Sequence, residues 1–172
     1  MKPTTTASNP SPGSLKIENF LRSKGIKFKR INDDKIIVPV YGDQGGKVAL
    51  SLVHSSSDNT FDVTAKDGVR QDSRWINEVM RFLNFVNSVP RIGCFYLCDH
   101  CDMIHFRHSQ KIDAADLSDA VITNAINTTN YLVINATLHV HLITGHGKTA
   151  EEAFKELMSP PNHHSKGHGG GK

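Results

Sequence analysis

Three cysteines and one histidine in the middle of the sequence carry side chains that can bind a metal ion. They are Cys94, Cys98, Cys101 and His105. The Cys-x-x-Cys spacing is that of half a structural zinc site, in which a tight turn aims two thiolates at one tetrahedral ion. The sequence has no evident second half, so we favour a hairpin that carries small, soft side chains. A zinc-binding module at Cys98 and Cys101, completed by tail histidines or a second subunit, is the alternative.

The predicted register of this hairpin decides which potential ligands share a face. A two-residue turn at Asp99-His100 pairs position 98 with 101, 96 with 103 and 94 with 105, which puts all four on one face. Cys94 is then about 13 Å from Cys98, whereas a zinc–sulfur bond measures about 2.3 Å. We therefore expect no single ion to bind all four, and assign no metal ligand. The opposite face, which we expect to pack on the preceding helix, carries Phe95, Ile104 and Phe106.

A second segment, Gly145 to Thr149, partly matches a phosphate-binding loop. Gly147-Lys148-Thr149 fits the end of the motif G-x-x-x-x-G-K-[ST], in which backbone amides and a lysine bind phosphates. The first glycine of the motif would fall at position 142, which is a leucine. We favour a glycine that ends one helix and a threonine that begins the next. A nucleotide-binding protein that uses this loop is the alternative.

Two smaller groups of residues also have functional interpretations. Four basic residues surround Phe28, as in a patch that binds nucleic acid, but lysines on a solvated edge strand explain them equally well. These four are Lys24, Lys27, Lys29 and Arg30. His139 and His141 would share a face on a strand, where they could ligate a metal, and would diverge on a helix. Three further histidines of the C-terminal tail could bind metal only loosely, and are His163, His164 and His168.

Composition and charge exclude several classes of protein. The chain has 172 residues, 38% of them hydrophobic, and a formal net charge of +3 that makes nucleic acid an unexpected partner. No segment approaches the roughly 18 consecutive apolar residues of a membrane span, and the N-terminus lacks a signal-peptide core. Three cysteines without a secretion signal favour reduced thiols. We therefore expect a cytoplasmic protein. Because no catalytic arrangement of Ser, His and acid stands out, we expect neither an enzyme nor a cofactor.

The elements that position these residues indicate one α+β domain at residues 14–158. Residues 1–13 and 159–172 are polar and are expected to be disordered tails, the second rich in His and Gly. A helix capped by Ser14 precedes four strands joined by short turns, at about 27–31, 35–41, 47–54 and 61–65. Short connections predict an antiparallel sheet with helices packed on it, in the order α-β-β-β-β-α-β-β-α-α.

The central helix and hairpin are followed by a less certain segment. The central helix, capped at Asp72 or Ser73, has an apolar stripe and ends before Pro90, and strands at 92–97 and 102–107 form the hairpin. Asp113 is predicted to cap a long helix that Gly145 ends. Residues 131–143 are rich in β-branched side chains and also alternate as a strand would, so helix is favoured there and strand stays open. A capping box of Thr149 and Glu152 begins the last helix.

The segments RFLNFVNSVPRIGCFYL and MIHFRHSQKID, followed by a helix from Asp113, resemble the YbjN-like proteins. That family shares its fold with the type III secretion chaperones, and the resemblance extends over about Ser14 to Leu157. The usual acidic or glycine-rich turn of the family is replaced by residues 98–101. The family has no catalytic motif, so the resemblance implies a non-enzymatic, chaperone-like or regulatory protein that binds a polypeptide, often as a homodimer.

The sequence suggests where such a partner would bind. A half-covered antiparallel sheet offers an edge strand that a partner strand can extend and apolar grooves beside its helices. Pro39 lies in the strand at 35–41 and has no backbone donor, which indicates that this strand is not fully paired. We therefore predict that the partner contacts Ile36, Val38 and Val40.

Overall fold

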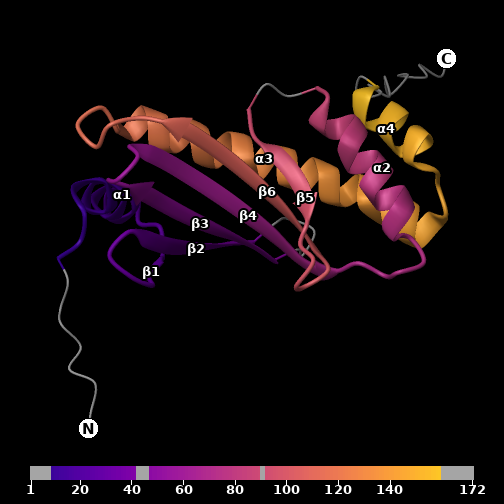
Figure 1. Cartoon of the computed structure of the whole chain (residues 1–172), viewed down its shortest axis with the longest axis horizontal. Helices are drawn as coiled ribbons and strands as arrows, with labels where there is room; N and C mark the ends of the chain where they lie inside the picture. The colour runs from indigo at the N-terminus through magenta and orange to yellow at the C-terminus, as the bar shows by residue number, and fades with distance from the viewer. Residues whose placement is uncertain (1–8, 42–46, 90–91, 160–172) are drawn as a thin grey trace, which may run out of the picture.

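The computed structural model describes residues 9–41, 47–89 and 92–159, which form a six-stranded antiparallel sheet and four helices (Figure 1). The strands lie in the order β1-β2-β3-β4-β6-β5. In chain order the elements are α1 (Pro12–Ser23), β1 (Lys29–Arg30), β2 (Lys35–Tyr41), β3 (Lys47–Ser55), β4 (Thr60–Arg70), α2 (Ile76–Asn87), β5 (Cys94–Leu97), β6 (Met103–Lys111), α3 (Asp119–His146) and α4 (Ala150–Met158). The predicted α+β class and order of elements are confirmed.

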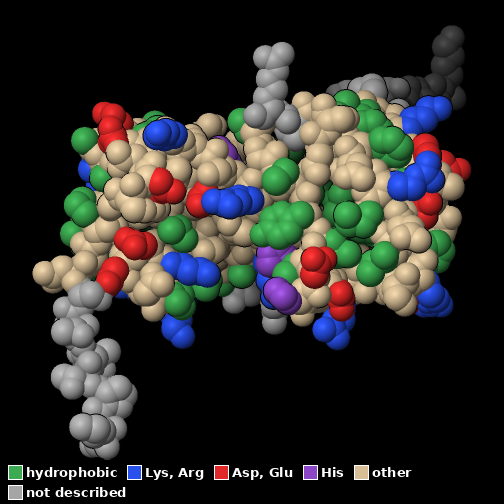
Figure 2. Space-filling model, in the orientation of Figure 1, with side chains coloured by type: hydrophobic (Ala, Val, Ile, Leu, Met, Phe, Trp, Pro, Cys, Tyr) green, Lys and Arg blue, Asp and Glu red, His purple; other side chains and the backbone are tan. Residues whose placement is uncertain are grey.

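One face of the sheet holds the core, because alternate residues along most of the described length of each long strand are buried. Cross-strand rows on this face join Ile36, Leu52 and Val63, and the adjacent row joins Val38 and Leu50. Helices α1 and α3 pack against it, and Figure 1 shows α3 running behind the sheet. The opposite face is open to solvent and carries charged and polar side chains among scattered apolar ones (Figure 2). The sheet is therefore half-covered, as the alternating strands predicted.

Helix α3 resolves the uncertain segment, since residues 131–143 lie within its 28 residues. Its predicted ends are wrong. Ser118, not Asp113, caps the helix by accepting from the Val121 amide, while the Asp113 carbonyl closes a separate turn. The helix ends at His146 because Gly147, with φ of 67°, supplies the left-handed residue that was expected at Gly145.

The N-terminal ends of α1 and α2 also differ from the predictions. Helix α1 begins at Pro12, within the predicted tail, because the Ser11 hydroxyl caps it and proline suits a first helical position. Ser14 is buried instead and accepts a hydrogen bond from Arg30. Helix α2 begins at Ile76 rather than after Asp72, whose carboxylate accepts from the Arg74 amide in a preceding turn.

The hairpin of β5 and β6 has a longer turn than predicted. Residues 94, 95, 96 and 97 pair with 107, 106, 105 and 104, so the predicted pairing of 94 with 105 is wrong by two residues. The Cys98 amide donates to the Met103 carbonyl, and Asp102 adopts a left-handed φ of 52°, which closes a four-residue turn. A slip of two residues preserves the faces of both strands. Phe95, Ile104 and Phe106 are therefore buried, as predicted.

Helix α2 closes the outer edge of β5 through one side chain. Asn87 lies at the end of α2, where its amide nitrogen donates to the Phe95 carbonyl at 2.9 Å. Its amide oxygen accepts from the Phe95 backbone N–H at 2.7 Å. The side chain thus makes both hydrogen bonds that a neighbouring strand would make at this residue.

Candidate partner-binding site

An apolar groove of about 310 Å³ lies between α2, α3 and α4. Val86 of α2 and Ala136 of α3 are buried side chains of its lining, and Leu132, Phe154 and Leu157 are half-buried ones. Most of the lining is apolar, with Asn135 as a polar exception. A groove of this size and composition suits a few apolar side chains of a ligand.

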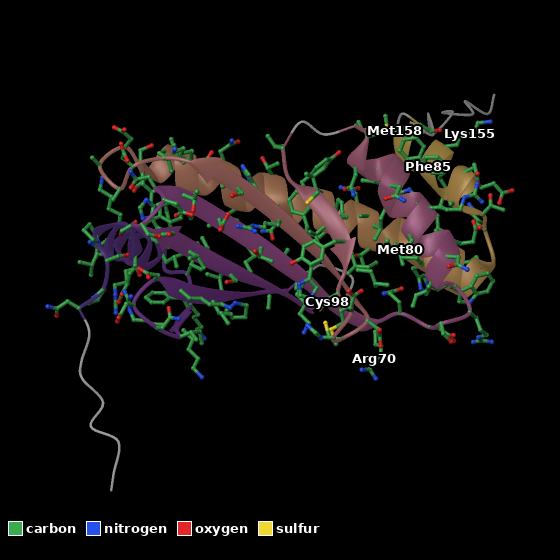
Figure 3. All side chains as sticks on the ribbon, in the orientation of Figure 1. Arg70, Met80, Phe85, Cys98, Lys155 and Met158 are labelled. Carbon is green, nitrogen blue, oxygen red and sulfur yellow. The ribbon has the colours of Figure 1, made fainter. Side chains whose placement is uncertain are left out.

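The walls of the groove are held together by contacts between α2 and α4. The rings of Phe85 on α2 and Phe154 on α4 lie 5.5 Å apart, and Figure 3 labels Phe85 on α2. The Glu78 carboxylate accepts from the Ala150 amide at 2.8 Å, and this bond lowers the pKa of Glu78. Arg81 forms an ion pair with Glu151. These contacts fix the first turn of α4 to α2 and so keep the groove preformed.

The rim of the groove exposes large apolar side chains to solvent. Tyr131 is 69% exposed, Met158 53% and Val89 49%. Ile134 and Leu138 continue the exposed apolar row from Tyr131 along α3, at spacings of three and seven residues that keep one helix face. Hydrophobic side chains also gather over α2 and α4 in Figure 2. A groove with an apolar rim of this kind is typical of a protein–protein contact.

The structure places the predicted partner-binding residues differently. Ile36 is fully buried and Val38 is 4% exposed, so both side chains belong to the core. The side chain of Val40 lies outside the described residues. The side chains of Ile36 and Val38 are therefore covered in the folded protein. A partner at this strand would have to use its backbone.

The outer edge of β2 is only partly paired within the described part of the chain. Strand β1 pairs with Ile36 and Ile37 and with no later residue of β2. The Lys35 carbonyl accepts from the Ile31 amide, so by alternation Ile37, Pro39 and Tyr41 also direct their backbone groups toward the β1 side. Pro39 therefore occupies a position where a missing donor costs no bond to β3, as an edge proline should.

Two of the sequence motifs have structural explanations. Gly147 ends α3, Thr149 and Glu152 form the capping box of α4, and Lys148 forms an ion pair with Glu156. The helix-end interpretation of this loop is thus confirmed. Phe28 lies under the Arg22 guanidinium, 5.3 Å from the ring centre, so this cation occupies one face of the ring.

The histidine pair and the basic residues near Phe28 also have structural explanations. His139 stacks on Phe82 with ring centres 6.3 Å apart, whereas His141 is exposed, so the two diverge on α3 as a helix requires. Arg30 bonds Glu18 and Ser14, which ties β1 to α1. His163, His164 and His168 lie outside the described residues.

The cysteine hairpin brings together three of the four potential ligands. The ligand atoms of Cys98, Cys101 and His105 all lie within 4.8 Å of one another. Cys94 is exposed, is paired with Arg107 across the strands, and is not part of this group. Sequence reasoning placed all four on one face and rejected the set because of the distance of Cys94. It missed that the turn folds Cys98 and Cys101 toward His105 without Cys94.

None of the helices in the described residues is long and apolar enough to cross a membrane.

Comparisons with known proteins give a structural match but no match in sequence. No family model matches the sequence, and no curated protein sequence matches it significantly. Among solved structures, the crystal structure of the ExsC-ExsE complex is similar to this chain, with a TM-score of 0.44 and 13% sequence identity. The similarity covers 73% of this chain and 91% of that chain. Membership of the YbjN-like family stays a prediction, and the function is argued below from the residues of this chain.

Proposed function

We propose that this protein is a non-enzymatic, chaperone-like or regulatory adaptor that holds a polypeptide partner in the groove between α2, α3 and α4. The observation that supports this is the preformed apolar groove with Tyr131 and Met158 exposed on its rim. The role agrees with the one implied by the resemblance to the YbjN-like proteins. Self-association and a cytoplasmic location are further parts of the same proposal.

The apolar lining of the groove and the exposed apolar row on α3 favour a helical segment as the bound part of the partner. An amphipathic helix presents apolar residues at spacings of three, four and seven, which match the row formed by Tyr131, Ile134 and Leu138. Burying the exposed parts of a few such side chains contributes on the order of 1 kcal/mol each. The binding free energy would therefore come from apolar contact, and no covalent bond of the partner would change.

The edge of β2 is a second proposed contact, at the predicted residues Ile36, Val38 and Val40. It is supported by the absence of a β1 partner beyond Ile37 in the described residues. A partner strand would pair there with backbone groups on the outer side. Replacing Val38 by a charged residue would disturb the core, so this proposal needs a backbone test, such as slower amide exchange in residues 37–41 on binding.

The groove is tested by photo-crosslinking in cells. A photoreactive phenylalanine analogue at Tyr131 should capture a defined protein, whereas the same analogue at Leu15, which is 44% exposed on α1, should not. With the captured protein purified, Tyr131→Glu and Met158→Glu should each weaken binding at least about tenfold, or about 1.4 kcal/mol. Leu15→Glu is the matched control and should leave binding unchanged.

Equal capture from positions 131 and 15, or full affinity in both groove variants, would contradict the proposal. Capture of a second copy of this chain would instead assign the groove to self-association. Circular dichroism of each variant checks that the fold is kept.

A further inference from the structure

A cluster of Cys98, Cys101 and His105 lies at the turn between β5 and β6, and Figure 3 shows Cys98 at this tip, away from Met158 on the rim of the groove. We propose that these three side chains bind one Zn²⁺ ion and leave a fourth coordination position for water or a ligand from a partner. All three are half-buried, so an ion can reach them from solvent. The inference is independent of the proposed function.

The spacing of the ligand atoms suits a tetrahedral ion. The Cys101 Sγ and the His105 Nε2 lie 3.5 Å apart. Zinc bonds of about 2.3 Å to sulfur and about 2.05 Å to nitrogen at a tetrahedral angle put these two atoms about 3.6 Å apart. The Cys98 Sγ lies within 4.8 Å of both, so a small rotation completes the set. Two thiolates and an imidazole are ligands that favour zinc over magnesium or calcium.

The backbone of the turn holds the two cysteines toward the strand that carries His105. The Cys98 carbonyl accepts from the Asp102 amide at 2.8 Å and from the Cys101 amide at 3.2 Å. Asp102 follows in its left-handed conformation, and Met103 then starts β6. This path returns Cys101 over the strand, so that its side chain meets that of His105 four residues later.

Tyr96 orients the imidazole of His105. The two residues face each other across β5 and β6, with ring centres 5.3 Å apart. The Tyr96 hydroxyl lies 3.4 Å from Nδ1 of His105, which leaves Nε2 directed at Cys101. A partner on the second nitrogen of a histidine ligand fixes its tautomer and ring orientation, and loss of such a partner typically weakens metal binding 10- to 100-fold.

A hydrogen bond and burial act on the ligands of the cluster, whose placement carries the proposal, and Lys66 adds a nearby positive charge. A hydrogen bond from Cys101 lowers the pKa of Cys98, and the positive charge of Lys66 lowers it further. Burial is the main cause that lowers the pKa of His105, and Lys66, its neighbour on β4, adds to this. A thiolate and a neutral imidazole are the forms that coordinate a metal. Asp102 pairs with Arg70 at 3.5 Å and is not part of the cluster.

The test uses the full chain with His163, His164 and His168 replaced by alanine, which removes loose binding by the tail. Titration with Co²⁺ in the presence of a phosphine reductant should give a thiolate-to-cobalt charge-transfer band and tetrahedral d–d bands that saturate at one equivalent. Zn²⁺ affinity is then measured by competition with a chelator. Cys98→Ser, Cys101→Ser and His105→Asn should each weaken it more than about 100-fold, and Tyr96→Phe by 10- to 100-fold.

Cys94→Ser is the matched control, because Cys94 lies in the same hairpin and outside the cluster. It should leave zinc affinity unchanged. Unchanged affinity in Cys98→Ser and Cys101→Ser, an equal loss in Cys94→Ser, or octahedral cobalt bands would each overturn the proposal.

A measurement on the chain with its native cysteines guards against variants that fail to fold. One equivalent of Zn²⁺ should protect Cys98 and Cys101 from alkylation by iodoacetamide, mapped by mass spectrometry, while Cys94 stays reactive. Equal alkylation of all three cysteines with and without zinc would refute the site. This outcome would not bear on the proposed binding of a partner in the groove.

Discussion

The two hydrogen bonds between Asn87 and Phe95 predict how much stability the fold loses when the Asn87 side chain is removed. Asn87→Ala removes the donor at 2.9 Å and the acceptor at 2.7 Å that close the edge of β5. Each such bond contributes about 1 kcal/mol net, and the two backbone groups of Phe95 lose their partners, so the free energy of unfolding should fall by about 2 kcal/mol. For a domain of this size the melting temperature should fall by about 4–8 °C.

The measurement is urea unfolding followed by circular dichroism, with hydrogen exchange at the Phe95 amide as a local readout. Asn84→Ala is the matched control, because Asn84 is exposed on the same helix and alanine favours the helix, so it should change stability by less than about 0.5 kcal/mol. Exchange at Phe95 should accelerate in Asn87→Ala alone. The reasoning is refuted if the two variants unfold alike, or if the Phe95 amide exchanges no faster.

Two further predictions concern the packing and protonation of buried histidines. Gly13→Ala would place a methyl group 2.3 Å from the buried His54 ring and should lower the free energy of unfolding in urea by about 1–3 kcal/mol. Gly145→Ala is the control, because its methyl group would meet only the exposed His141 ring at 3.0 Å. It should leave stability unchanged or raise it by up to about 1 kcal/mol. Equal effects of the two would contradict the close packing of α1 on β3. Burial lowers the pKa of His108 below its usual 6.5. As the pH falls, the unfolded chain therefore takes up the proton before the folded chain does. The stability that is present above pH 6.5 should be lost as the pH falls below 6.5. Urea midpoints measured between pH 7.5 and 5 should show this loss, and His108→Gln should reduce it; a pH profile unchanged by that substitution would contradict the assignment.

The class of fold was predictable because its signals are local. The alternation at Val48, Leu50 and Leu52 marks a strand with one buried face, and the apolar stripe of α2 marks a helix with one covered side. The buried face of the hairpin was also predictable, since a slip of two residues leaves Phe95 and Phe106 on the same side. The register was not, because the turn depends on a left-handed Asp102 that no two-residue turn rule anticipates.

The candidate sites were harder to predict because they depend on contacts between distant segments. The groove needs α2, α3 and α4 at one place, and the Glu78 bond that fixes α4 joins residues 72 positions apart. Tyr131 and Met158 carry no sign in the sequence that they share a rim. The proposed metal cluster depends on the path of one turn. That turn brings Cys98 and Cys101 to His105 and leaves Cys94 outside, although the alternation of residues in both strands predicts one shared face for all four.

The two edges of the sheet differ in a way that bears on how a partner binds. At β5, Asn87 already makes the hydrogen bonds that an added strand would need at Phe95. At β2, the outer side beyond Ile37 has no β1 partner among the described residues, but Pro39 offers only a carbonyl there. An added strand would therefore lose a donor in the middle of its contact, and proline on an edge is a known protection against strand pairing. The groove has no such protection: it is preformed and rimmed by exposed apolar side chains. This contrast makes the groove the principal proposed contact and the edge of β2 the secondary one.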